Sequence, residues 1–331
     1  MKGCVPALVA TVMAACSAAA EPLTFSGPAM GTTYRVTLAA PWAGMAVGTM
    51  HRDVERLLAR IDRAASTWRE DSDARRFNRA AAGEWVEIGP DLAALLAVAR
   101  RVHEASNGAF DVTAGPLVRH WREAQPPATG QTGGQTTNQT TGQLSDRFSH
   151  QLAAIRTRVG MSLVELRPAA QERPAAIRKR VDGVELDLAG IGPGFAVDRI
   201  GERLVDVGSD SHLVELGGEV RAWGERGHGN PWRVRVGASA EGGRVIELSA
   251  GKALATASID AGRMIVDPRT GQGIAGPARS LTVVAETCGE ADAWAVAAIV
   301  LDLHPDEDGL VRVPPAPSTT AAPPAARPAA P

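Results

Sequence analysis

The 331-residue sequence contains little cysteine, lysine or aromatic residue. Its three cysteines cannot build a disulfide framework or a closed four-ligand zinc site. Two of them, Cys4 and Cys16, lie in the first 16 residues, so the body of the chain has only Cys288. The formal net charge is −2, and this near-neutral balance gives no electrostatic reason to expect nucleic acid as a partner.

Several well-known catalytic signatures are also missing from the sequence. The seven histidines show no metal-ligand spacing such as H-E-x-x-H, which argues against a catalytic zinc. There is no G-x-S-x-G motif of a nucleophilic serine and no Gly-Lys-Ser/Thr of a P-loop. What is present is ordinary for a globular protein with a sizeable core: 44% hydrophobic and 22% charged residues.

The N-terminal residues 1–20 are typical of an export signal. The apolar stretch Val5–Ala15 is too short to span a bilayer. The sequence offers two alternative processing sites for this signal. One is an A-x-A-like cleavage site at Ala18–Ala20, and the other is a lipobox-like Met13–Cys16 whose cysteine would carry lipid. Both predict an exported, periplasmic protein, and the second predicts a membrane-anchored lipoprotein.

Two low-complexity segments interrupt or follow the expected fold. Residues 125–143 are rich in Gln, Thr and Gly, and residues 314–331 are rich in Pro and Ala. Neither has enough apolar residues to form a core, so we expect a mobile insert and a disordered tail. This leaves one domain over residues 21–313.

Hydrophobic periodicity gives a coarse secondary structure for this domain. Alternation over Thr33–Ala39 predicts a strand, and the apolar stripe from Met50 to Ile61 predicts an amphipathic helix. A second helix is expected over Asp91–Ser106, capped by Asp91 and ended by Gly108. Further elements are expected as helices at 151–159, 195–204 and 291–303 and as strands at 184–188, 213–216, 232–236, 245–248 and 281–285. Without a regular βαβ alternation, the fold class is α+β.

Acidic residues and glycines mark three places where chemistry is plausible. The loop Gly190–Gly194 precedes a helix and resembles a phosphate-binding turn, although by itself the pattern favours a plain structural turn. Asp187, just before it, is suited to bind a ligand or to cap the turn. Asp111 lies in apolar surroundings, where it must either bond nearby backbone N–H groups or contact a ligand or metal. Asp292, at the start of an apolar helix, has the alternative of a simple N-terminal carboxylate.

In their order along the chain, these fragments resemble the motifs of the ApbE family, the FAD:protein FMN transferases. The resemblance covers about residues 26–303, apart from the insert, and rests on M-G-T-T-Y (30–34), S-T-W-R-E-D-S (66–72), F-N-R (77–79), G-A-F-D-V-T-A-G-P-L (108–117), D-L-A-G-I-G-P-G-F-A-V-D (187–198), G-G-E-V (217–220), A-T (255–256), D-P-R-T-G (267–271) and A-D-A (291–293).

The resemblance implies an exported enzyme that uses FAD and Mg²⁺. Such an enzyme transfers FMN from FAD to a Thr or Ser hydroxyl of a partner protein and releases AMP. By motif matching, the residues expected at the FAD site are Met30, Trp68, Ala109, Phe110, Asp111, Asp187, Pro193 and Ile265. The Gly190 carbonyl and Asp292 are expected to contact Mg²⁺.

Three departures from the family pattern fall in this same set of motifs. Met264 stands where the family commonly has a histidine, and a thioether cannot take a proton at neutral pH. Val296 replaces a threonine whose hydroxyl helps hold the metal, and Pro193 replaces a lysine or another polar residue. No catalytic residue is therefore assigned. Two hypotheses remain: a working FMN transferase whose base comes from elsewhere, or a degenerate relative that binds FAD, or only keeps the fold, as an envelope binding protein.

Overall fold

The computed structural model describes residues 22–39, 44–124, 148–171, 173–227, 229–237, 243–259, 264–274 and 279–313. The predicted signal with both of its alternative ends, the Gln/Thr-rich insert and the Pro/Ala-rich tail lie outside these residues. Among the helices that the structure describes, none has the length and apolar character needed to cross a membrane.

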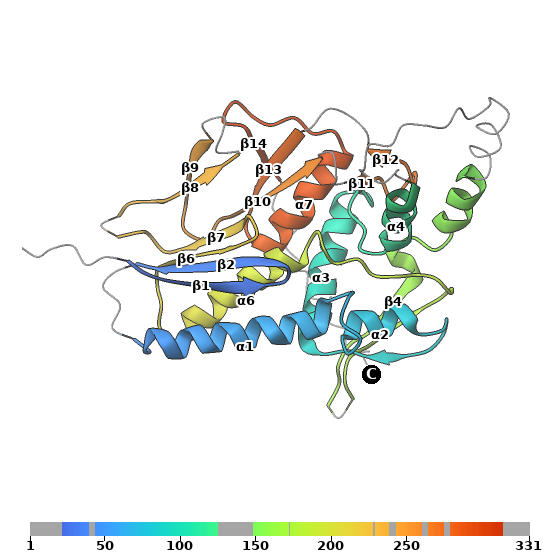
Figure 1. Ribbon diagram of the computed structural model, residues 1–331, viewed down its shortest axis with the longest axis horizontal. Coiled ribbons are helices and arrows are strands. Elements are labelled where there is room, and N and C mark those ends of the chain that lie inside the picture. The colour runs from blue at the N-terminus through green and yellow to red at the C-terminus, as the bar shows by residue number, and fades with distance from the viewer. Residues whose placement is uncertain are drawn as a thin grey trace, which may run out of the picture.

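A seven-stranded mixed sheet forms the centre of the structure (Figure 1). Its strands, in spatial order, are β1 (Leu23–Ala29), β2 (Thr32–Leu38), β6 (His212–Leu216), β7 (Glu219–Trp223), β10 (Ala253–Ile259), β13 (Arg279–Ala285) and β14 (Leu310–Arg312). Neighbouring strands are antiparallel except β13 and β14, which are parallel.

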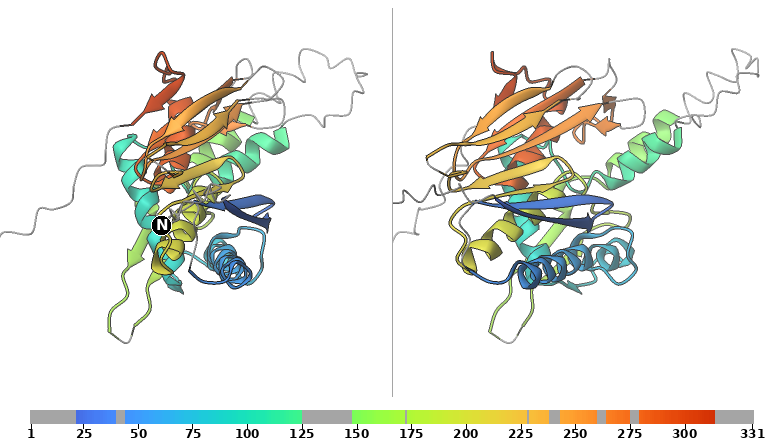
Figure 2. Two further views of the ribbon diagram at one scale, coloured as in Figure 1. Left: turned by 90° about the vertical axis from the view of Figure 1, so that its left-hand side faces the viewer. Right: turned by 60° about the vertical axis from the view of Figure 1, so that its left-hand side comes forward.

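Helices cover one face of this sheet. Two of them, α6 (Gly192–Asp206) and α7 (Cys288–Val300), pack directly on the central strands and against each other. Behind them, α1 (Val47–Ala65) contacts α6 and β1, and α3 (Pro90–Ala105) contacts α7. Figure 2 shows α1 running alongside the β1–β2 end of the sheet. The helix α7 is buried on most sides, in agreement with its apolar sequence.

Smaller elements surround this core. The other face of the sheet carries the hairpin β8 (Trp232–Val236) and β9 (Arg244–Leu248), whose apolar side chains pack against β7 and β10. A three-stranded sheet has the order β3 (Val86–Glu87), β5 (Ala176–Lys179) and β4 (Val164–Arg167). The remaining elements are α2 (Asp73–Arg79), α4 (Gly115–Ala124), a 3₁₀ turn (Met161–Leu163) and the hairpin of β11 (Ile265–Val266) with β12 (Gly273–Ile274).

The mixed α/β architecture confirms the expected fold class, and most of the predicted elements are found. The stripe from Met50 to Ile61 is the buried face of α1, because its spacing of three and four residues places these side chains on one side. Tyr34, Val36 and Leu38 are the buried residues of β2. Residues 148–156 are helical, so the helix expected at 151–159 ends earlier than predicted.

Three local predictions were wrong. Residues 184–188 do not form a strand; Glu185 makes one isolated bridge to Ala114, and the Asn78 side chain takes the backbone hydrogen bonds of Leu186. Asp91 does not cap α3, because Gly89 is the N-cap and Pro90 occupies the first turn. The last helix begins at Cys288 rather than at residue 291, because Thr287 caps it by accepting a hydrogen bond from the Glu290 N–H, and it ends at Val300.

Candidate functional site

The loop Gly190–Gly194 lies where several predicted site residues meet. A Cβ atom placed on Gly190 would lie 3.0 Å from Val296 Cγ2 and 3.6 Å from Phe110 Cε2. A Cβ on Gly192 would lie 3.4 Å from Met30 Cε. The glycines therefore let α6 begin directly against side chains from three distant parts of the sequence.

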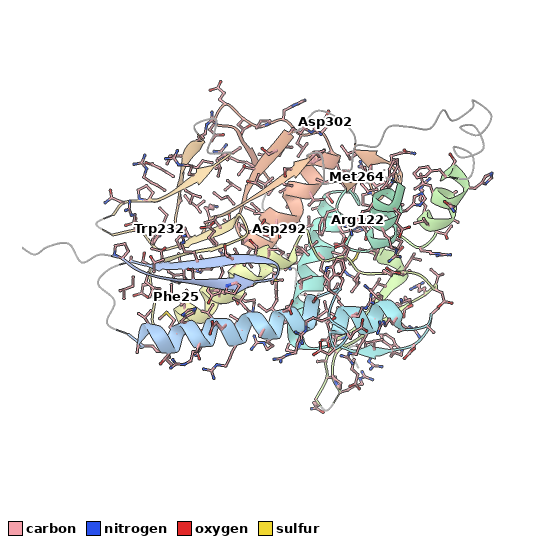
Figure 3. All side chains as sticks on the ribbon, viewed as in Figure 1. Phe25, Arg122, Trp232, Met264, Asp292 and Asp302 are labelled. Atoms are coloured by element: carbon pink, nitrogen blue, oxygen red, sulfur yellow. The ribbon has the colours of Figure 1, made fainter. Side chains whose placement is uncertain are left out.

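The same loop is bonded to Asp292. The Gly194 N–H donates to Asp292 Oδ2 at 3.0 Å, which joins the first turn of α6 to α7. Glycine is required at position 194, because a Cβ there would lie 2.8 Å from the Asp292 Cβ and 2.7 Å from the Cys288 carbonyl carbon. Figure 3 shows Asp292 at the end of α7 that lies beside the large sheet. Asp292 is thus more than an exposed N-terminal carboxylate: it is buried where two helices begin.

Buried carboxylates shape the electrostatics of this region. Burial raises the pKa of Asp292 well above its ordinary value, and the negative charges of Glu219 and Asp198 raise it further, whereas the Gly194 N–H opposes the shift. Burial also raises the pKa of Asp198, against the effect of Arg221. Asp198 accepts from the backbone N–H groups of Cys288 and Gly289 at 2.8 and 2.9 Å and from Arg221 Nη1 at 2.6 Å.

Asp187 lies beside the 108–117 motif. Its backbone N–H donates to the Val112 carbonyl at 2.7 Å, and a Cβ on Gly115 would lie 3.5 Å from the Asp187 Cβ. The Asp187 carboxylate accepts from the Ala189 N–H at 3.1 Å and is only half-buried. It therefore stabilises the start of the glycine loop, in agreement with the turn-capping alternative, and keeps an accessible side.

Hydrogen bonds from the Asn78 side chain of α2 hold the segment before Asp187 in place. Asn78 donates to the Leu186 carbonyl at 3.0 Å and accepts from the Leu186 N–H at 2.7 Å. The buried Lys179 ammonium donates to the carbonyls of Asn78 and Val184 at 3.0 and 2.7 Å. Burial lowers the pKa of Lys179, whose Nζ lies 4.8 Å from the centre of the Phe77 ring.

Asp111 uses its carboxylate to hold its own turn. It accepts from the N–H and hydroxyl of Thr113 at 2.7 and 2.6 Å and from the Met161 N–H at 3.1 Å, as its turn-forming alternative predicts. His103 Nδ1 lies 3.3 Å from Asp111 Oδ2. His103 and Asp111 line a cavity of about 510 Å³ together with Arg156 and Arg269.

The remaining predicted FAD-site residues differ in what they can offer a ligand. The Ala109 side chain is fully buried, so this residue offers only its backbone. Pro193 is in the first turn of α6 and is half-buried. Ile265, in β11, packs against the main core. Trp68 follows α1 and is 84% exposed; among the described residues, no hydrogen bond, ion pair or ring contact joins it to the other site residues.

Met264 lies in an apolar environment. A Cβ on Gly273 would lie 3.0 Å from its sulfur and 3.2 Å from Trp121, and Met264 packs on the small cluster of Leu117, Leu152 and Val266. Figure 3 shows Met264 near α4 and the β11–β12 hairpin, on a different element from Asp292. Nearby, the Asp267 carboxylate binds the guanidinium of Arg269 through two bonds of 2.9 Å.

Sequence reasoning missed several residues that support this site. Asn78 belongs to the F-N-R motif, which by itself assigns it no partner. The sequence feature that could have pointed to it is an amide directly after an aromatic residue, Phe77, which the structure shows to be fully buried. Glu219 stands in the G-G-E-V motif without an assigned role, and Lys179 belongs to no motif, because its contacts are with residues far away in the sequence. Among the described residues, no group of three or more His, Cys, Asp and Glu side chains is arranged to hold a metal by itself.

Comparisons with known proteins identify the family of this chain. A model of the ApbE family matches residues 30–310. The FAD:protein FMN transferase of Haemophilus influenzae is 29% identical over 91% of this chain and 87% of that protein, and that of Klebsiella pneumoniae is 27% identical over 86% and 80%.

Solved structures show the same similarity. The apo flavinyl transferase ApbE of Pseudomonas stutzeri matches with a TM-score of 0.69 at 29% identity, covering 87% of this chain and 86% of that one. The flavin transferase ApbE of Vibrio cholerae matches with a TM-score of 0.68 at 28% identity, covering 87% and 89%. Because the family model spans most of the sequence, this chain belongs to the ApbE family.

Proposed function

We propose that this protein is an FAD:protein FMN transferase, which moves FMN from FAD to a Thr or Ser hydroxyl of a partner protein and releases AMP. The relatives carry this name, and their similarity extends over most of both chains. The observation that carries the proposal is the meeting of Met30, Phe110 and Asp292 around the glycine loop Gly190–Gly194.

The reaction would be a phosphoryl transfer. The acceptor oxygen bonds to the phosphorus of the FMN half, the bond from that phosphorus to the bridging oxygen breaks, and AMP leaves with this oxygen. Catalysis of such a transfer depends mainly on positioning and charge stabilisation. In this chain the loop at the N-terminus of α6 is suited to the pyrophosphate, since a helix N-terminus favours an anion. The exposed indole of Trp68 offers a flat face for a flavin or adenine ring.

The residues at this site fit Mg²⁺, although with few protein ligands. Mg²⁺ prefers oxygen and is usually held by one or two carboxylates together with substrate phosphates. Asp292 supplies a carboxylate whose ionisation is opposed by burial and by neighbouring negative charges, a setting that a divalent cation would relieve. The Gly190 carbonyl is the second proposed ligand, whereas Val296 at the same place offers no oxygen. When bound, Mg²⁺ would neutralise charge that develops on the phosphates.

A second candidate function is FAD binding without transfer. The observation that favours it is the position of Met264, which packs among apolar side chains where the family commonly has a histidine. If that histidine takes the proton of the acceptor hydroxyl, its loss would cost on the order of 10²–10⁴ in rate. Such a protein would keep the flavin site and act in the envelope as a binding protein.

The proposed location is outside the cytoplasm. The support is the signal-like segment 1–20, which would be cleaved after Ala20 or would leave Cys16 as a lipid-carrying N-terminus. The mass of the mature protein, compared with that of the Cys16→Ala variant, would distinguish the two: a mass increase lost in the variant indicates lipidation.

The transferase proposal is tested with purified protein, FAD, Mg²⁺ and a partner that carries the acceptor hydroxyl, with an ApbE relative that labels this partner as a positive control. In-gel flavin fluorescence on the denatured partner is the expected result. No covalent flavin, under conditions where the relative labels the partner, would refute transfer. Saturable FAD binding would then favour the second candidate, and its absence would exclude both.

A further inference from the structure

We propose that the partner protein binds as an extra strand along the unpaired edge of β10, and that this places its Thr or Ser hydroxyl beside the glycine loop. This inference rests on the proposed function, because the partner is the protein that receives FMN. It assigns a binding surface and a conformation to the acceptor segment, which neither the sequence motifs nor the comparisons do.

The edge of β10 that faces β7 is paired over only part of its length. Strand β7 pairs with β10 at Ala253 and Leu254, whereas β13 pairs with every residue from Ala253 to Ile259. Within the part of the chain that the structure describes, no other strand pairs with β10. Residues 255–259 therefore have an unpaired edge, to which an extended segment of another chain can add a strand.

The hydrogen-bond pattern shows which backbone groups this edge offers. The Ala222 N–H donates to the Lys252 carbonyl at 3.0 Å, so Lys252 directs this group toward β7. Alternate residues of an antiparallel strand direct their backbone groups to the same side, so Thr256 and Ser258 do as well. The Oγ1 atoms of Thr256 and Thr282 lie 2.9 Å apart, which agrees with a pair that makes no backbone bonds between β10 and β13. The N–H and carbonyl groups of Thr256 and Ser258 are thus directed toward the unpaired edge.

The helix α7 brings the proposed catalytic site to this part of β10. Strand β13 ends at Ala285 opposite Ala253, and α7 begins three residues later at Cys288. From there α7 runs back along β10 and contacts β11, which follows β10 (Figure 1). Asp292 lies one turn, about 6 Å, beyond the start of α7, a distance that two residues of a strand cover. Asp292 and the glycine loop bonded to it are therefore level with the start of the unpaired edge.

An added strand would use both faces of the sheet, because its side chains alternate between them. One set would point toward the helical layer, where Asp292 and the glycine loop lie, and this is the side for the acceptor hydroxyl. The other set would point toward a cavity of about 520 Å³ whose walls include Gly218, Val220, Leu254 and Thr256. Val220 and Leu254 pack against the β8–β9 hairpin, so this cavity is on the face opposite the helices. The edge thus has space for side chains on the face away from the site.

The matched test compares Ser258→Pro with Ser26→Pro. Proline at 258 removes the N–H that this residue directs toward the unpaired edge. Ser26 is an exposed residue of β1, the outermost strand of the sheet. Its N–H points away from β2, because Ala29 and Thr32 pair directly across their two-residue turn, and Pro28 already occupies a position with this outward orientation. The control therefore removes an equivalent N–H from a different edge.

The variants are assayed with FAD, Mg²⁺ and the partner that the ApbE relative labels. We expect Ser258→Pro to raise the partner concentration for half-maximal labelling about tenfold, because a hydrogen bond between strands is lost. FAD affinity and the urea unfolding midpoint should stay unchanged, and Ser26→Pro should match the unmodified protein. The same half-maximal concentration for all three proteins would overturn the inference and leave the transferase proposal standing. If Ser258→Pro also changes FAD affinity or the midpoint, amide exchange decides.

Amide hydrogen exchange tests the inference on the unmodified protein. The partner carries Val or Ala in place of its acceptor Thr or Ser, so that no transfer occurs, and the protein with FAD and Mg²⁺ alone is the reference. The partner should slow exchange at Thr256 and Ser258 and leave Ala255 and Ala257 unchanged, because these alanines already direct their N–H groups toward β13. Unchanged exchange at Thr256 and Ser258 would overturn the inference. If the unmodified protein labels no partner that the relative labels, the transferase proposal itself fails.

Discussion

Val296 faces Gly190: its Cγ2 atom lies 3.0 Å from the place where a Cβ on Gly190 would be. Val296 therefore lies beside the residue whose carbonyl is the proposed ligand, at the position of α7 where the resemblance to the family implies a threonine hydroxyl. Restoring it with Val296→Thr should increase Mn²⁺ affinity about tenfold, or about 1.4 kcal/mol, because Mg²⁺ and Mn²⁺ both accept oxygen ligands. Free Mn²⁺ is followed by electron paramagnetic resonance in the presence of FAD, with Mg²⁺ as competitor.

The control for this substitution is Val300→Thr, which adds the same hydroxyl one turn later on the same helix. It should leave Mn²⁺ affinity unchanged. Equal affinities for all three proteins would mean that position 296 does not face the cation.

Met264→His tests whether the apolar side chain at this position limits transfer. If a base here takes the proton of the acceptor hydroxyl, the substitution should raise the rate of flavin attachment by about 10²–10⁴. The rate is measured from the time course of covalent flavin on the partner. Met264→Leu keeps the apolar contact with Trp121 and Gly273 and should behave as the unmodified protein. An unchanged rate in Met264→His would locate the limitation elsewhere.

Trp68 should contribute to flavin binding through its exposed ring. Trp68→Ala is expected to weaken FAD binding about 3–10-fold, which corresponds to about 0.5–1.5 kcal/mol for a stacked aromatic pair, whereas Trp68→Tyr should retain most of the affinity. The measurement is a titration of flavin fluorescence. As a control, Trp85, whose ring centre lies 4.7 Å from the Cζ atoms of both Arg167 and Arg178, should tolerate substitution by Tyr without any effect on FAD.

The bonds between Asn78 and Leu186 should contribute to stability. Asn78→Ala leaves the N–H and carbonyl of Leu186 without their bonds, which should cost about 2–4 kcal/mol in the free energy of unfolding measured with urea. Asn230→Ala removes an exposed bond to the Gly227 carbonyl and should cost less than about 0.5 kcal/mol. Similar losses of unfolding free energy in both variants would mean that the bonds between Asn78 and Leu186 contribute no more to stability than an exposed hydrogen bond does.

His212 should make stability depend on pH. Burial lowers the pKa of His212 from 6.5 to about 4, and the side chain packs on the Trp223 ring. Between these values the unfolded chain binds a proton that the folded protein does not, so stability falls as pH decreases from about 6.5 to 4. The full loss is about 3 kcal/mol.

The measurement is urea unfolding of the unmodified protein and of His212→Phe at pH 7 and pH 4.5. The unmodified protein should lose more stability than the variant, because phenylalanine does not titrate. Equal losses would show that His212 does not cause this part of the pH dependence.

The sequence predicted the elements whose burial follows a simple period. The stripe of α1 and the alternation of β2 are visible because each buried face repeats along one element. The prediction of a strand at 184–188 was wrong because this segment is as apolar as a strand. Its central residue, Leu186, instead makes its backbone hydrogen bonds with the side chain of Asn78, 108 residues earlier. Such a contact leaves no local pattern in a single sequence.

For the site, the motifs predicted the residues but not their contacts. The meeting of Gly190, Phe110 and Val296 depends on how α6 and α7 pack, which no spacing in the sequence specifies. The same is true of Glu219, whose charge acts on a residue 73 positions later. The departure at Met264 was visible from the sequence, whereas its packing beside Trp121 required the structure.

The most direct test of the proposed function is to measure, in one reaction with FAD, Mg²⁺ and the partner, both the AMP released and the flavin attached. We expect one attached FMN for each AMP, with attachment abolished when the acceptor Thr or Ser of the partner is replaced by Val or Ala. AMP formed without attached flavin would indicate FAD hydrolysis, and neither product, with FAD bound, would contradict transfer outright.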